Sequence, residues 1–201
     1  MSGKTLLKVF FNFRSPYCYL ASKTMFSLID DYDVEFAWRP LGGWDGRSPP
    51  DRAKVKLPLA RQDVARWAKR MDIAYSPPPP TTDPTPAGLG SLLAEEKGCL
   101  REYIVEVMHH EWSASQDIGQ EEVLMPIAES LGTDKDEFAA ALVDAEKIKA
   151  LENNWQEAQQ AGVIGVPTFV VNDQIFWGND RIDFVSEYLE ELGLGKSEEC
   201  R

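Results

Sequence analysis

The residues best placed for chemistry are Ser15-Pro16-Tyr17-Cys18, at the predicted start of the first helix. Serine at an N-cap, followed by proline at the first helical position, is a strong start signal. The amides and dipole of such a helix start stabilise a thiolate. Cys18 has no cysteine partner at Ser15, so this turn cannot close a disulfide of its own. We expect it to hold a thiolate from another molecule, with Ser15 donating a hydrogen bond; the alternative is that Ser15 only caps the helix.

A second candidate segment is Gly165-Val166-Pro167-Thr168, at the entry to a predicted strand. A proline that opens a strand is unusual, and the peptide bond before it is often cis. The residue before such a proline can offer its backbone N–H and C=O to an extended peptide, as in strand addition. We therefore expect Val166 to hold the backbone of a peptide-like ligand. A simple turn proline is the alternative.

The third candidate is the segment Trp177-Gly178-Asn179-Asp180-Arg181, directly before an amphipathic run. Asn or Asp at this place is an ordinary helix cap. A free helix N-terminus also receives carboxylates, and the Asp180 carboxylate can pair with an α-ammonium group. The segment therefore predicts a site for a ligand end that carries both charges, with helix capping alone as the alternative.

The first candidate segment must be positioned by a β-α-β unit at the N-terminus. Residues 6–13 alternate and are rich in Val, Phe and Leu, which is typical of a buried strand. From Tyr17 to Ile29 apolar residues recur at helical spacing. Residues 34–38 then have the pattern of a second short strand.

The other two segments belong to a β-β-α unit near the C-terminus. Residues 167–171 and 174–177 have the pattern of short strands, and Asn172-Asp173 between them is a tight hairpin signal. Residues 180–192 follow as an amphipathic helix.

The middle of the chain is almost wholly helical in pattern. The exception is residues 76–86, which contain four consecutive prolines and predict an extended connector over the surface. This connector is either a spacer or a wall or lid of the site. The candidate helices span residues 61–71, 98–112, 121–131, 135–143 and 148–161.

This order of elements predicts an α/β protein with a thioredoxin-like fold that carries a large all-helical insertion. We expect residues 1–45 and 162–195 to form the thioredoxin-like domain and residues 46–161 to form the inserted helical domain. Residues 196–201 read as a flexible tail.

Composition narrows the classes of partner. The 21 Lys and Arg against 33 Asp and Glu give a net charge of −12, which repels nucleic acid and anionic membrane surfaces. No stretch approaches ~18 continuous apolar residues, so no membrane span is expected. Three dispersed cysteines and no secretory signal indicate a reducing compartment, with the cytosol as the default. His109-His110-Glu111 lacks the i, i+4 spacing of helix-borne ligands, so no metal site is expected.

Three segments together resemble the 2-hydroxychromene-2-carboxylate isomerase family: FNFRSPYCYLA, KVKLPLARQDVARWAK and GVIGVPTFVVNDQIFWGNDRI. That family is related to kappa-class glutathione transferases and belongs to the wider DsbA-like group. The resemblance covers nearly the whole chain in order. It implies a thioredoxin fold with a helical insertion, a homodimer, glutathione as cofactor and a small-molecule substrate from an aromatic-catabolic or similar conjugated class.

The resemblance also implies roles for individual residues. Ser15 matches the catalytic serine beside the glutathione sulfur, and Val166 matches the backbone clamp before the cis proline. Asn179 and Asp180 match the site of the γ-glutamyl end, and Lys56 resembles the lysine that reaches the glycyl carboxylate. The implied glutathione site therefore comprises Ser15, Lys56, Val166, Pro167, Asn179 and Asp180.

Two departures from the family leave alternatives open. Cys18 stands where many relatives have a hydroxyl residue, which keeps a thiol–disulfide oxidoreductase in view. The stretch WDGRSPPDR, residues 44–52, replaces an asparagine that some relatives have upstream of the lysine. An isomerase that acts by reversible thiolate addition is our first hypothesis. A kappa-like transferase or peroxidase and a binding module remain alternatives, and Arg39, Lys56 and Arg66 are candidate partners for a substrate carboxylate.

Overall fold

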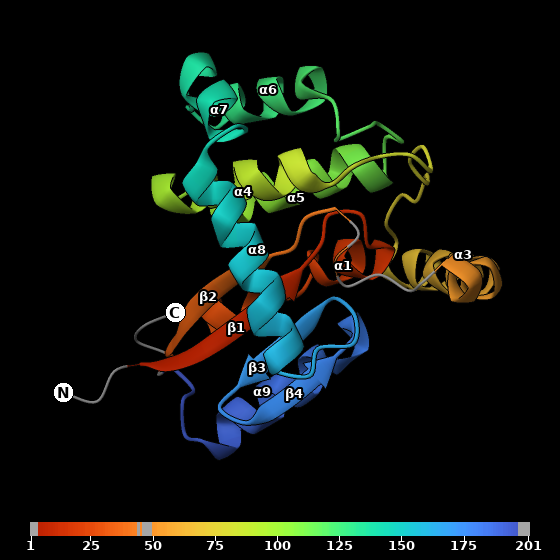
Figure 1. Ribbon diagram of the computed structural model, residues 1–201. Coiled ribbons are helices and arrows are strands. Elements are labelled where there is room, and N and C mark those ends of the chain that lie inside the picture. The colour runs from red at the N-terminus through yellow and green to blue at the C-terminus, as the bar shows by residue number, and fades with distance from the viewer. Residues whose placement is uncertain (1–3, 44, 46–49, 197–201) are drawn as a thin grey trace.

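A four-stranded sheet joins the two ends of the chain. In the computed structural model, which describes residues 4–43, 45 and 50–196, the strand order is β2-β1-β3-β4 (Figure 1). The strands are β1 Thr5–Phe11, β2 Val34–Pro40, β3 Thr168–Val171 and β4 Gln174–Trp177. β1 and β2 are parallel, whereas β3 is antiparallel to both β1 and β4. Halves of the chain that are far apart in sequence therefore share one sheet, as the predicted order requires.

The helices occupy the long stretch between the two halves of the sheet and also cover it. Figure 1 shows α8 crossing one face of the sheet, α9 on the other, and α4 to α7 grouped to one side. The bounds are α1 Pro16–Ala21, α2 Ser27–Asp30, α3 Pro50–Met71, α4 Thr85–Lys97, α5 Leu100–Trp112, α6 Glu121–Ser130, α7 Lys135–Ala141, α8 Ala145–Gln160, the short 3₁₀ helix η1 Asn179–Arg181 and α9 Ile182–Glu191. Within the described ranges, no helix has both the length and the apolar character needed to cross a bilayer. The thioredoxin-like fold with a helical insertion is thus confirmed.

The sequence prediction was wrong at three helices. The first helix is broken into α1 and α2 by a turn at residues 22–26. α3 begins at residue 50, eleven residues before the predicted start, and runs through Pro58. α4 was missed altogether, because its sequence TPAGLGSLLAEEK has two glycines and no polar face over its first eight residues. Residues 87–91 of α4 are all buried, so no amphipathic period marks this helix.

A cluster of aromatic side chains joins the sheet to the helical insertion. The rings of Phe11 and Phe13 lie 5.3 Å apart, and Phe13 also meets Tyr103 of α5 at 6.2 Å between centroids. Trp38 of β2 donates from its indole to the Ser91 hydroxyl of α4 at 2.9 Å. In β1, the side chains of Leu7, Val9, Phe10 and Phe11 are fully buried. The end of β1, where the chain leaves the sheet, is therefore held rigidly.

The predicted flexible tail lies largely outside the described residues. Of residues 196–201, the structure describes Lys196 only, whose backbone N–H donates to the Asp31 carbonyl at 2.8 Å. In the stretch 44–52, which departs from the family, residues 44 and 46–49 also lie outside the described residues. The proposed domain boundary near residue 45 therefore stays a prediction.

Two glycines of α4 allow a test of the packing. A Cβ at Gly90 would meet the Tyr103 hydroxyl and would lie 2.8 Å from Phe138 Cε2, whereas at Gly88 the nearest contact is an ordinary 3.6 Å to Leu151. Gly90→Ala should lower the free energy of unfolding by about 1–3 kcal/mol through overpacking. Gly88→Ala should leave it unchanged or raise it by up to about 1 kcal/mol through helix propensity. Urea denaturation measures both, and equal effects would contradict the packing described.

Candidate functional site

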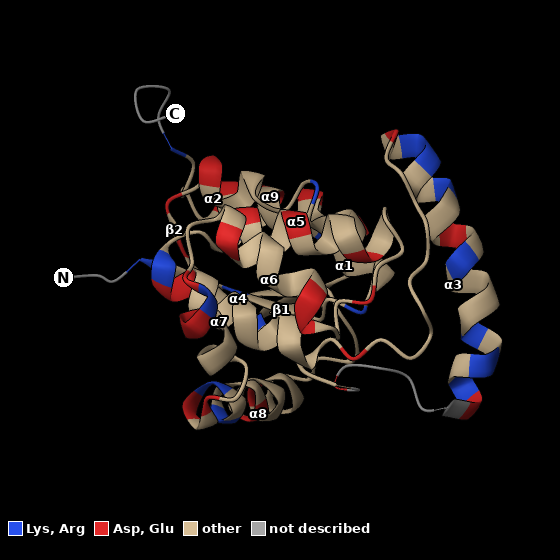
Figure 2. Cartoon of the chain, turned by 90° about the horizontal axis from the view of Figure 1, so that it is seen from above, with Lys and Arg blue, Asp and Glu red and all other residues tan. Residues whose placement is uncertain are grey.

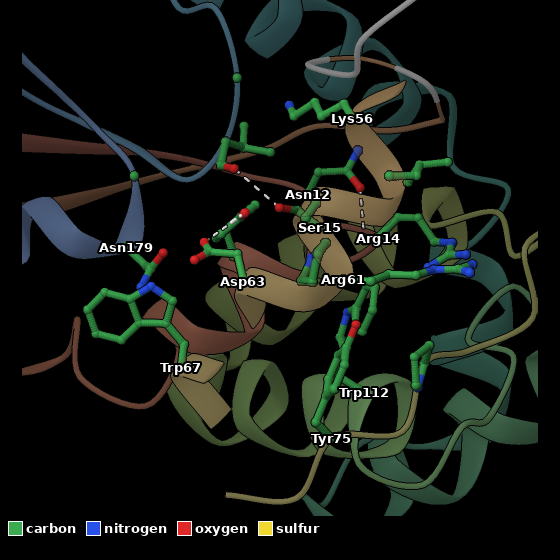
Figure 3. A pocket seen from close by; sticks show the side chains of 18 of the residues that line it. Asn12, Arg14, Ser15, Lys56, Arg61, Asp63, Trp67, Tyr75, Trp112 and Asn179 are labelled. Atoms are coloured by element: carbon green, nitrogen blue, oxygen red, sulfur yellow. Dashed lines mark hydrogen bonds between the residues drawn. The ribbon is translucent and has the colours of Figure 1, made fainter. Parts of the chain in front are cut away.

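A pocket of about 550 Å³ opens where β1 passes into α1. Its walls come from the start of α1, one face of α3, the segment 75–80, and the loops at 165–166 and 177–181 (Figure 3). Five of the six sequence-predicted positions line it, namely Ser15, Lys56, Val166, Asn179 and Asp180. The sixth, Pro167, is bonded to Val166. The fold therefore gathers three separate sequence segments around one cavity.

Ser15 joins two of these segments directly. It is the N-cap of α1, with φ −92° and ψ 120°, and its Oγ accepts from the Cys18 N–H at 3.4 Å. The same hydroxyl donates to the Val166 carbonyl at 3.2 Å. The peptide bond between Val166 and Pro167 is cis, as the position of the proline predicted. The Ser15 hydroxyl thus lies between the helix start and the cis peptide.

The turn that carries Ser15 is held by a buried asparagine. Asn12, 1% exposed, donates from Nδ2 to the Leu41 carbonyl at 3.2 Å and accepts the Arg14 N–H on Oδ1 at 2.9 Å. Its carbonyl also accepts from the Ser15 N–H at 2.9 Å. Because a buried amide satisfied in this way fixes its neighbours, Asn12 sets the angle at which the chain leaves β1.

Tyr17 connects α1 to α3 across the pocket. Its hydroxyl donates to Asp63 Oδ2 at 3.0 Å. Burial and this hydrogen bond together raise the pKa of Tyr17 to about 12, so the phenol stays protonated and remains the donor. Asp63 lies seven residues, or two helical turns, after Lys56, so the two share one face of α3. The bond therefore turns the Lys56 face toward the cavity, where Figure 3 shows that residue at the rim.

Cys18 is not available for thiol chemistry in this structure. Its side chain is 0% exposed, within the aromatic and aliphatic core. Burial raises the pKa of the Cys18 thiol to about 12, although the hydrogen bonds with Asn12 and Ser15 act in the opposite direction. A buried, protonated thiol is a poor nucleophile, so the observation disfavours the oxidoreductase alternative.

The segment before α9 is positioned by the cis-proline loop. Gly178 has φ 120°, a conformation that favours glycine, and its N–H donates to the Pro167 carbonyl at 3.0 Å. Asn179 and Asp180 follow in η1 and face the pocket. Asp180 Oδ2 pairs with Arg181 Nη1 at 2.7 Å, with both side chains about half exposed. An ammonium group at Asp180 would therefore compete with Arg181.

Sequence reasoning misplaced two cations and missed others. Arg39 binds Glu157 at 2.6 Å, and neither Arg39 nor Arg66 lines the pocket. Arg14 and Arg61 do line it, on the side away from Lys56 in Figure 3. Arg14 directly precedes Ser15, a position that could have drawn attention to it. The proline-rich connector lines the pocket with Pro77, Pro78 and Pro80. Of the two roles considered for it, it therefore forms a wall of the site and is not a plain spacer.

Comparison with known proteins adds the family. A model described as a DSBA-like thioredoxin domain matches residues 6–190. The chain belongs to this family. Among relatives of this DSBA-like domain, a 2-hydroxychromene-2-carboxylate isomerase from Sphingobium xenophagum is 28% identical over 196 residues, covering 90% of this chain and 95% of the relative. The protein of the same name from Pseudomonas putida is 26% identical, with 95% of each chain covered.

A solved structure supports the same fold. The structure of a 2-hydroxychromene-2-carboxylate isomerase superposes on this DSBA-like domain with a TM-score of 0.81 at 24% identity, covering 93% of this chain and 95% of the other. The names of the two sequence relatives indicate an enzyme of the DsbA-like group.

The burial of Cys18 in this DSBA-like domain leads to a labelling prediction. With N-ethylmaleimide at pH 8, Cys99, which is partly exposed, should be labelled in the native protein, while Cys18 should not. The reason is that a pKa of about 12 leaves only about one thiol in 10⁴ ionised at that pH. Peptide mass spectrometry measures both sites, and unfolding in guanidinium should make Cys18 reactive. Native labelling of Cys18 at the rate of Cys99 would contradict the buried placement.

Proposed function

We propose that this protein is a glutathione-dependent isomerase of a small conjugated substrate. The observation that carries the proposal is the meeting of the Ser15 hydroxyl with the Val166 carbonyl, at 3.2 Å, on the wall of the pocket. This arrangement offers a hydroxyl and a backbone edge to a cysteinyl group, and no cysteine is among the described residues that line the pocket. The isomerase names of the sequence relatives, over at least 90% of this chain, support the type of reaction.

The donor set of the pocket fits glutathione. A cavity of about 550 Å³ is in the size range of small-molecule sites, which is roughly 300–1,000 Å³. Its charged lining residues are four cations and two carboxylates: Arg14, Lys56, Arg61, Arg181, Asp63 and Asp180. The lining is net positive, which favours anionic ligands, and a tripeptide with two carboxylates, one ammonium group and an ionised thiol is net negative.

Two of the four lining cations, Lys56 and Arg61, come from one helix. α3 contains seven of the 21 Lys and Arg residues of the chain but only two acidic residues (Figure 2). A basic helix beside the pocket attracts anionic ligands, although the protein as a whole has a net charge of −12.

In this proposal each residue has one task. Lys56 pairs with the glycyl carboxylate, and Val166 pairs through its backbone with the cysteinyl residue. Asn179 and Asp180 receive the γ-glutamyl end. Ser15 turns its hydroxyl from the Val166 carbonyl toward the cavity and donates to the sulfur anion, which lowers the energy of the ionised form.

When bound, glutathione supplies a sulfur nucleophile that adds to one carbon of a conjugated double bond and leaves again, so that the bond can rotate in between. The protein's own groups hold the reactants in place and exclude water. Trp67, Trp112 and Tyr75, together with the prolines at 77, 78 and 80, give the remaining wall an apolar surface suited to a flat conjugated molecule.

The reaction type can be tested with 2-hydroxychromene-2-carboxylate, the compound in the relatives' names. We expect the change in its ultraviolet absorbance to depend on glutathione and to saturate with it. A thiol titration should find the glutathione concentration unchanged after complete conversion. Stoichiometric loss of thiol would instead establish a transferase, and a rate independent of glutathione would refute the proposal.

The roles of the two principal residues can be separated by mutation. Ser15→Ala should lower kcat by about 10²–10³-fold, as for the loss of one charge-stabilising donor, with little change in glutathione Kd. Lys56→Gln should raise the Kd by up to about fivefold, because the side chain is exposed.

Lys54→Gln is the matched control, since Lys54 lies on the same helix but does not line the pocket. Calorimetric titration of glutathione gives Kd for each variant. Equal effects of Lys54→Gln and Lys56→Gln would show that Lys56 acts only through the general charge of α3.

A further inference from the structure

Arg14 is held in a fixed position at the edge of the pocket. One terminal nitrogen lies 3.4 Å from Glu111 Oε1, and the other donates to the Pro79 carbonyl at 2.8 Å. The guanidinium carbon lies 5.4 Å from the centroid of the Trp112 ring. Its remaining nitrogen, Nε, is buried and has no hydrogen-bond partner among the described residues. The guanidinium is thus positioned from three sides, and its Nε–H makes no hydrogen bond with the residues that the structure describes.

The partner that fixes Arg14 is unusual in its burial. Glu111 of α5 is 0% exposed and does not line the pocket. A buried carboxylate is costly unless a cation lies beside it, so Glu111 holds Arg14 at this place. Because Arg14 lines the cavity and Glu111 does not, the guanidinium is the member of this pair that the cavity meets.

Tyr75 offers a second unused donor close to Arg14. Its hydroxyl is buried without a hydrogen-bond partner in the described chain, and its ring stacks on Trp112 at 6.1 Å with an angle of 8°. Burial raises the pKa of Tyr75, while the guanidinium groups of Arg61 and Arg14 act in the opposite direction. The phenol is therefore protonated, able to donate, and near both cations.

Arg61 completes the group from α3. Its side chain is exposed and makes no hydrogen bond or ion pair with any residue that the structure describes. Burial lowers the pKa of Arg14; Glu111 raises it, and the positive charge of Arg61 acts in the same direction as burial. Figure 3 shows Arg14 and Arg61 reaching toward the same side of the pocket, above Tyr75 and Trp112. Two neighbouring cations repel each other unless an anion lies between them.

We propose that Arg14, Arg61 and Tyr75 form a carboxylate-recognition corner for the second molecule in the pocket, whose flat conjugated part lies against Tyr75 and Trp112. A carboxylate matches the corner because it is planar and accepts several hydrogen bonds at once. Arg14 and Ser15 line the same pocket, so the corner shares one cavity with the proposed sulfur site. That this second molecule is the substrate rests on the proposed function; the preference for a carboxylate does not.

The test compares 2-naphthoate with 2-naphthamide, which share a flat ring system and differ in charge. Calorimetric titration without glutathione should give a Kd about tenfold lower for naphthoate. Arg61→Gln and Arg14→Gln should remove this preference. Tyr75→Phe keeps the ring and should weaken naphthoate about threefold or more, with naphthamide unchanged.

Arg66→Gln is the matched control, because Arg66 is exposed on the same helix and does not line the pocket. It should retain the full preference. Arg61→Gln is the deciding variant, because an exposed side chain that makes no hydrogen bond or ion pair with a described residue can be replaced without loss of folding. Arg14→Gln leaves the buried Glu111 without its cation, so a thermal melt must show that this variant still folds. Equal binding of naphthoate and naphthamide by the unmodified protein, or an unchanged preference in Arg61→Gln, would overturn the corner.

Glutathione is titrated separately into the same samples. If the protein prefers naphthoate but does not bind glutathione, the carboxylate-recognition corner is supported and the proposed function is refuted. If it binds glutathione but shows no preference for naphthoate, only the carboxylate-recognition corner is refuted.

Discussion

The hydrogen bond from the Ser15 hydroxyl to the Val166 carbonyl is the interaction on which the site depends. It joins two segments 151 residues apart in sequence, one at the start of α1 and one at the entry to β3. The pairing of β1 with β3 brings these segments together, and the buried Asn12 sets the turn between β1 and Ser15. The residue after Val166 is Pro167, whose carbonyl accepts a hydrogen bond from the Gly178 N–H and so positions η1. One small cluster of hydrogen bonds thus orients three of the five segments that line the pocket, namely the start of α1 and the loops at 165–166 and 177–181.

The same helix start lacks the pair of cysteines that a dithiol protein carries at this place. A thioredoxin-like helix start is suited to stabilising a sulfur anion, yet here the accessible position carries a hydroxyl. The thiol at Cys18 is enclosed by the core, with its pKa raised to about 12. The described residues that line the pocket therefore provide the stabilising environment without a thiol of their own. An external thiol that also has a peptide backbone and two acidic ends would engage the hydroxyl, the backbone edge and the cations together.

Local signals in the sequence predicted several features of the site and the fold. They could not predict contacts between segments that lie far apart in the sequence. The Ser15 cap, the cis bond before Pro167 and the hairpin at Asn172 each depend on residues within a few positions, so their patterns are visible in the chain. α4 was not visible, because its residues 87–91 are buried on every side of the helix and give it no polar face with a helical period.

The polar pairs of the pocket had no local signature either. Tyr17 and Asp63 lie 46 positions apart, and Arg14 and Glu111 lie on different elements that meet only in the folded chain. Arg39 and Arg66 were equally plausible cations by composition, and only the fold excludes them from the pocket. Residue type alone could not distinguish a pocket arginine from a surface one.

α3 supplies one whole wall of the pocket yet stands to one side of the rest of the chain (Figure 2). It packs mainly on α1, through contacts such as Tyr17 with Asp63, and Val55, Leu57 and Leu59 on it remain more than half exposed. Among the residues of this helix whose burial the structure describes, only Val64 and Ala68 are buried apolar side chains. Substitutions along most of its length can therefore alter which molecules are accepted at little cost to folding. Selectivity can evolve on α3 while the sheet and its aromatic cluster preserve the fold.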